Sequence, residues 1–93
     1  MTVPEVDDRE EEPVADLADF RSFYAQRYPS AVRLAFVFTG DAAASEDVAQ
    51  EAFVRVRGRF DTLREPWPYT RAAVVNAART AARRTRRERT RLT

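Results

Sequence analysis

The sequence predicts an all-α protein, a compact bundle of four helices behind a disordered acidic N-terminal tail. Large apolar residues recur at spacings of three and four, which is the periodicity of a helix with one buried face. Little of the chain alternates between apolar and polar residues as a strand does, and only two of the 93 residues are glycine. A chain of this length with 44% apolar residues suits one small domain with a modest core.

The predicted tail comprises residues 1–14, which combine two prolines and a run of acids with almost no large apolar side chains. Such a segment buries too little apolar surface to order itself, so disorder is expected. Asp16 is expected to cap the first helix, which ends near Pro29. The helical domain is therefore predicted to span residues 15–88. The apolar face of its first helix comprises Leu17, Phe20, Phe23, Tyr24 and Tyr28.

Two further helices are expected before residue 61. The second begins at Pro29 and ends at Gly40, since proline favours the first turn of a helix and glycine its C-terminal end. Asp41 or Ser45 caps the third helix, which runs to about residue 60. The apolar face of the third helix comprises Val48, Ala52, Phe53 and Val56.

The segment 61–70 is expected to be a loop, because two prolines flank Trp67 and restrict the residues before them. Pro68 suits the first turn of a fourth helix, which runs from about Tyr69 into the arginine-rich C-terminal end. The residues expected to face inward from it are Tyr69, Ala72, Ala73, Val75, Ala78 and Ala82.

The composition argues against an enzyme. The chain has no cysteine and no histidine, which removes disulfides and thiolate chemistry and argues against a zinc site. Its serines have no neighbouring base, and no glycine-rich phosphate loop is present. We therefore expect no cofactor and no small-molecule substrate. The sequence shows no membrane-spanning run and no signal peptide, so a cytoplasmic protein without membrane insertion is expected.

The net charge of +1 hides a strong polarity along the chain. Residues 1–19 carry eight acids and one arginine, for a net charge of −7, whereas residues 52–93 carry twelve arginines and three acids, for +9. All sixteen basic residues are arginines, whose planar fork suits phosphates and base edges. Such asymmetry predicts a polyanionic partner for the C-terminal half.

The last helix is expected to present a basic ridge to that partner. Residues 79–91 hold seven arginines and one glutamate, whereas an ordinary solvated helix mixes the two signs. Nucleic-acid contact is therefore favoured over simple solvation. Trp67 and Tyr69 lie just before the ridge and either stack on unpaired bases or fill the core. The ridge comprises Arg71, Arg79, Arg83, Arg86 and Arg87, with Asn76 as its only amide.

The third helix has a polar stripe on a different side from its apolar face. Any charged residues would keep such a helix soluble, so solvation alone does not explain why the stripe has these particular residues. Asp47 and Glu51 lie on one side of it, but one pair of acids four residues apart is too common to indicate catalysis. The stripe comprises Asp47, Gln50, Glu51, Val54 and Arg57.

The runs "TGDAAASEDVAQEAFVRVRGRFDTL" and "PYTRAAVVNAART" resemble the region-2 domain of bacterial sigma factors, and most closely that of the extracytoplasmic-function (ECF) group. The resemblance covers about residues 16–88. It rests on the Gly40–Asp41 turn, on an Asp-x-x-Gln-Glu-x-Phe run in the third helix, and on Asn76 seven residues after Tyr69. The residues that carry this spacing are Asp47, Gln50, Glu51 and Phe53.

The resemblance implies a transcription initiation factor with two contact surfaces. The third helix would dock on the clamp helices of the RNA polymerase β′ subunit, through the polar stripe defined above. The fourth helix and the loop 61–67 would recognise and melt the promoter −10 element and hold a flipped base of the non-template single strand. An anti-sigma factor is a further expected partner. The DNA-binding residues are expected to be Arg64, Trp67, Tyr69, Arg71, Asn76, Arg79, Arg83 and Arg86.

The chain departs from the family pattern in two places. Many members carry an aspartate four residues after the asparagine, where this chain has Thr80, and Tyr69 rather than Trp67 fills the usual aromatic position. The family's further C-terminal domain, which reads the −35 element, does not follow, so residues 89–93 are expected to be the start of an interdomain linker in an excised domain.

Two other functions remain possible on the residues alone. A basic helical packaging protein would bind nucleic acid through charge, with steep salt dependence and no sequence preference. A pure interaction domain would instead bind a regulatory protein on the same faces.

Overall fold

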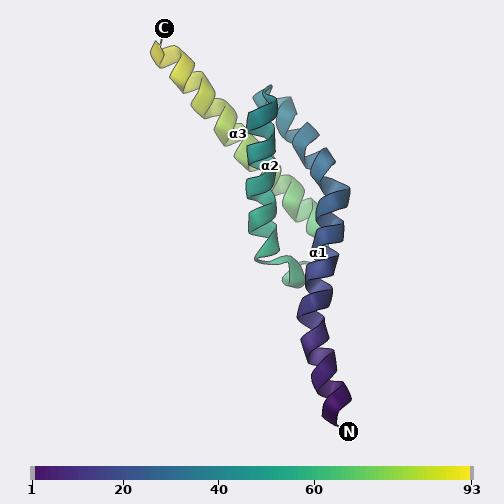
Figure 1. Ribbon diagram of the computed structural model, residues 1–93. Coiled ribbons are helices and arrows are strands. Elements are labelled where there is room, and N and C mark those ends of the chain that lie inside the picture. The colour runs from purple at the N-terminus through teal and green to yellow at the C-terminus, as the bar shows by residue number, and fades with distance from the viewer. Residues whose placement is uncertain (1, 93) are drawn as a thin grey trace.

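In the computed structural model, described for residues 2–92, three α-helices lie against one another (Figure 1). They are α1 (Thr2–Thr39), α2 (Ala42–Arg57) and α3 (Pro66–Leu92), with a short 3₁₀ helix η1 (Phe60–Thr62) after α2. No strand occurs among the described residues, so the predicted all-α class is confirmed. Side chains are described for residues 17–92. The backbone of residues 2–14 belongs to α1, so the structure differs from the predicted disordered tail, and Asp16 lies inside the helix and does not cap its start.

The prediction of four helices was wrong, because the first two form one continuous helix, α1, across Pro29. Proline cannot donate to the carbonyl four residues earlier, here that of Ala25. Both residues are exposed, so water can bond that carbonyl instead. The buried face of α1 also continues through the proline without a break, which favours one helix over two. It comprises Phe20, Tyr24, Tyr28, Ala31, Ala35 and Phe38.

The turn between α1 and α2 follows the sequence-based prediction. Gly40 has a φ of +65°, in the left-handed region that favours glycine, and its N–H donates to the carbonyl of Phe36 at 2.9 Å. The carboxylate of Asp41 accepts the N–H of Ala44 at 2.9 Å and caps α2. Ser45 does not cap the helix. It is fully buried and donates to the Asp41 carbonyl at 2.7 Å.

The start of α3 lies earlier in the chain than predicted. Pro66 and Trp67 were expected in a loop, but they lie in the first turn of α3 together with Pro68, for which that position was expected. Both prolines fit there because the first four N–H groups of a helix have no partner within it. Thr70 is fully buried, and its hydroxyl donates to the Pro66 carbonyl at 2.8 Å.

Small residues form much of the core where the three helices meet. Ala31 and Ala35 of α1 and Ala49 and Ala52 of α2 are almost completely buried, which lets the helix backbones approach closely. From α3, Val74 and Ala78 complete the core. The prediction that Ala72 faces inward was wrong, because Ala72 is exposed and Val74 occupies the buried position.

Aromatic rings close the core between α1 and α2. Phe53 of α2 is the largest fully buried side chain, and it lies 4.8 Å from the ring of Tyr24 and 5.7 Å from that of Phe23, measured between centroids. Phe60 of η1 contacts Phe20 at 5.5 Å. The C-terminal part of α3 extends past the other helices (Figure 1), and its residues are exposed from Arg83 onward. Within the described residues, no helix has both the length and the apolar character needed to cross a membrane.

Candidate functional site

The outer side of α2 is one continuous exposed surface, which we call the α2 face. Its residues lie opposite a side of the helix whose members, such as Ala52 and Val56, are 1% exposed or less. Val54 is 72% exposed, although an apolar side chain gains no hydrogen bonds from solvent. The structure therefore brings together all the residues predicted for polymerase binding. The α2 face comprises Asp47, Gln50, Glu51, Val54 and Arg57.

Few internal contacts occupy the polar groups of the α2 face. Glu51 pairs with Arg55 at 3.6 Å, but both side chains are more than 60% exposed, so the pair contributes little to stability. The Gln50 amide donates to the Tyr28 hydroxyl of α1 at 3.4 Å, a long hydrogen bond. These side chains are therefore available to a partner at little cost to the fold.

A mainly apolar hollow of about 290 Å³ adjoins the α2 face where α2 meets α1. Phe20 and Tyr24 form its α1 wall, Phe53 forms its floor, and Val54 and Arg57 border it. The Arg57 guanidinium lies 6.0 Å from the centre of the Phe20 ring. Burial raises the pKa of the Tyr24 hydroxyl above its usual value of 10.0, and the neighbouring Tyr28 raises it further. Sequence reasoning missed this hollow because it depends on which α1 residues face α2.

The outer side of α3 carries the predicted DNA-binding residues. Asn76, Arg79, Arg83 and Arg86 are all exposed, and at 100° per residue they lie within about 80° of one another around the helix. Arg71 is exposed too, but it lies about 140° around the helix from Asn76. The structure thus brings four of these residues onto one side, which we call the α3 face, and Arg71 lies at its edge, about 60° around the helix from Arg86.

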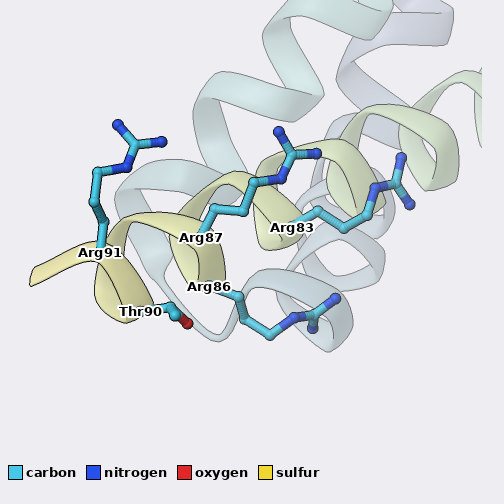
Figure 2. Close-up of a pocket in the computed structure, with 5 residues that line it drawn as sticks. All are labelled: Arg83, Arg86, Arg87, Thr90 and Arg91. Carbon is cyan, nitrogen blue, oxygen red and sulfur yellow. The ribbon is translucent and has the colours of Figure 1, made fainter. Parts of the chain in front are cut away.

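Beyond Asn76 the α3 face becomes strongly basic. Figure 2 shows the guanidinium groups of Arg83, Arg86, Arg87 and Arg91 extending outward from the end of α3, around an open hollow of about 580 Å³. No acidic side chain lines this hollow. Nearer the bundle, the Thr80 hydroxyl donates to the carbonyl of Asn76 at 3.0 Å, and Arg83 donates to that hydroxyl at 3.5 Å.

The aromatic residues at the start of α3 are partly buried and are covered by arginines. Trp67 packs against the core, and the Arg27 guanidinium lies 4.8 Å from the centre of its ring. The Arg59 guanidinium lies 5.2 Å from the Tyr69 ring. Arg64 is exposed in the short segment between η1 and α3. Of the two roles weighed for Trp67 from the sequence, core packing is the one that its contacts favour.

A groove of about 380 Å³ joins the α2 face to the α3 face. Asp47, Glu51 and Arg55 line its α2 side, and Asn76 and Arg84 line its α3 side. Two residues of each charge sign therefore meet in it. No group of three acidic side chains that could hold a metal ion occurs among the described residues.

The sequence matches the family model of Sigma-70 region 2 over residues 23–88. The match includes α1 from Phe23 onward, all of α2, and α3 through Glu88. No curated protein and no solved structure matches the chain.

Proposed function

The chain belongs to the Sigma-70 region 2 family, and from this membership we propose which of its faces bind RNA polymerase and which bind promoter DNA. Region 2 of sigma-70 factors is a non-catalytic module of transcription initiation, which binds RNA polymerase and recognises the promoter −10 element. The proposal assigns the α2 face to the clamp helices of the polymerase β′ subunit. It assigns the α3 face, with the segment before α3, to the non-template strand of the −10 element.

One observation carries the polymerase assignment. The α2 face is exposed over its whole length while the opposite side of the same helix is fully buried, so α2 is held in place by the core and presents a fixed surface. Val54 supplies an apolar centre, and polar residues of both signs surround it, as in many protein interfaces. An exposed surface of mixed charge with an apolar centre suits a helical protein partner better than a nucleic acid.

The DNA assignment rests on charge and on exposed donors. The α3 face combines arginines, which bind phosphates without regard to sequence, with the Asn76 amide, which both donates and accepts hydrogen bonds. Arg64 and the short segment around it would form one wall of a pocket for a flipped base. Since flipping a base costs far less in a single strand than in duplex, this arrangement favours melted DNA.

We further propose that the chain belongs to the ECF group and acts in the cytoplasm with RNA polymerase. An anti-sigma factor would then cover the same two faces. A packaging protein that binds nucleic acid through charge alone is the competing function, because the hollow at the end of α3 is lined by arginines.

The test measures binding of the chain to the isolated clamp helices of β′. Gln50→Ala and Asp47→Ala should each weaken binding, and truncations at the centre of an interface often cost about 2 kcal/mol. Gln26→Ala is the matched control, because Gln26 is exposed on α1 and lies about 200° around the helix from Tyr24, which faces α2. Unchanged affinity in both α2 variants, with melting temperatures like that of the parent chain, would reject the polymerase assignment.

A further inference from the structure

A hollow lies between the end of α1 and the outer side of α3. No residue of the segment between η1 and α3 lines it. Its volume is about 350 Å³. Phe38, from the last turn of α1, lines the hollow. It is half-buried and packs against the core. The α3 residues that line the hollow are Arg79, Ala82, Arg83 and Arg86.

The charge of this hollow distinguishes it from the groove on the other side of α3. Three arginines and no acidic residue line the hollow, whereas Asp47 and Glu51 stand in the groove between α2 and α3. No carboxylate among the described side chains pairs with Arg79, Arg83 or Arg86. Arg55 and Arg84 also line the groove and balance its two acids, whereas the hollow is basic only. A phosphate chain that follows α3 is therefore attracted more strongly on the Phe38 side.

Arg79 is held in a position that suits a nucleobase. Its guanidinium lies 5.6 Å from the centre of the Phe38 ring, a cation–π contact between α3 and α1. The Arg79 side chain is nevertheless exposed, so the side of the guanidinium away from Phe38 faces solvent. A guanidinium plane backed by an aromatic ring is a surface on which unpaired bases stack.

We propose that this hollow binds one unpaired nucleotide of single-stranded DNA, with its base on Arg79 and its flanking phosphates on Arg83 and Arg86. Phe38 acts as a positioning residue, because it holds the guanidinium in place. Arg83 and Arg86 also line the open hollow of Figure 2, so the bound strand continues along the arginines at the end of α3. The proposal deepens the DNA assignment above and rests on it only in taking single-stranded DNA as the ligand.

The test compares two oligonucleotides with the same number of phosphates, an oligothymidylate of about twelve nucleotides and its fully abasic counterpart. Phe38→Leu should weaken binding of the 93-residue chain to oligothymidylate about five- to tenfold, since it removes the support for the stacked base. Binding of the abasic strand should stay unchanged, because its phosphates still meet Arg83 and Arg86. Phe38→Tyr keeps the ring and should restore the parent affinity.

Phe36→Leu is the matched control, because Phe36 lies two residues away on α1, is 48% exposed and does not line the hollow. An equal loss for both strands in Phe38→Leu, or no loss for either, would overturn the proposal. Oligothymidylate carries no −10 sequence and the assay contains no polymerase. The two proposals therefore fail separately, and loss of clamp-helix binding or of sequence preference leaves this result unaffected.

Discussion

At the scale of single residues, the α3 face contains two kinds of side chain with different consequences for DNA. The amide of Asn76 can both donate to and accept from a base edge, whereas the guanidinium of Arg83 only donates and carries charge. Asn76 is exposed, and the hydrogen bond recorded at this residue uses its carbonyl, which accepts from Thr80. Its side-chain amide makes no hydrogen bond among the described residues and is open to solvent.

We expect Asn76→Ala to reduce discrimination between a preferred −10 strand and base-swapped strands by about 1 kcal/mol or more, with little change in salt dependence. Arg83→Ala should instead weaken binding to all sequences alike and lower the slope of log affinity against log salt by about one. Fluorescence anisotropy over a series of salt concentrations measures both. A loss of discrimination in Arg83→Ala and not in Asn76→Ala would reverse these assignments.

Tyr24 gives a pH dependence to stability. Burial and the adjacent Tyr28 raise the pKa of Tyr24 in the folded chain above the value of 10.0 that it has when unfolded. Stability is therefore fully present below about pH 10 and falls as the pH rises further, because the unfolded chain then releases a proton that the folded chain retains. Urea unfolding should show this fall in the parent chain and a smaller one in Tyr24→Phe. The same fall in both would rule out Tyr24 as its source.

At the scale of elements, the turn and the periodicity of α2 could be predicted from the sequence, whereas the proline positions and the tertiary packing could not. The Gly40–Asp41 turn was predictable because its glycine and its capping carboxylate act within a few residues. The division of α2 into a buried and an exposed side was predictable because it follows from helical periodicity. The hollow at Phe38 was not predictable, because it depends on how α1 and α3 pack.

Proline explains why the number of helices was misjudged. Pro29 reads as the start of a helix, Pro66 reads as part of a loop, and Pro68 reads as the first turn of the last helix. In the structure the buried face of α1 runs through Pro29. Pro66 and Pro68 lie in the first turn of α3, where a backbone N–H would have no partner within the helix. Packing of the apolar face therefore prevails over the local preference of proline.

Pro29→Ala tests the continuous α1 directly. If Pro29 lies inside a helix, alanine restores the hydrogen bond to the Ala25 carbonyl and should raise the free energy of unfolding by roughly 1–2 kcal/mol. If Pro29 instead begins a separate helix, where proline is favoured, alanine should be neutral or destabilising. Chemical denaturation monitored by circular dichroism distinguishes the two results.

At the scale of the whole molecule, charge is divided between the two ends of the chain. The first nineteen residues carry a net charge of −7, and the end of α3 carries the arginines that would bind phosphate. An acidic segment attached to a DNA-binding domain can act as a competing polyanion. The α2 and α3 faces share a groove, so partners on the two faces would lie next to each other.

Deleting residues 1–14 should therefore raise the affinity for single-stranded DNA at low salt, with the gain disappearing at high salt because screening removes it. A chain in which the acids of this segment are replaced by their amides serves as the control for length. It should behave like the deletion. No change in either variant at low salt would indicate that the segment only aids solubility.

The central claim is that the chain recognises a melted −10 element, and its most direct test is a comparison of single-stranded with duplex DNA. A −10 non-template strand is selected from a randomised pool, and its anisotropy-derived affinity is compared with that of its duplex and of base-swapped strands. The claim predicts tightest binding to the selected single strand, since a flipped base costs a few kcal/mol less there than in duplex. Equal affinity for duplex, single strand and every sequence would contradict the claim and favour a packaging protein.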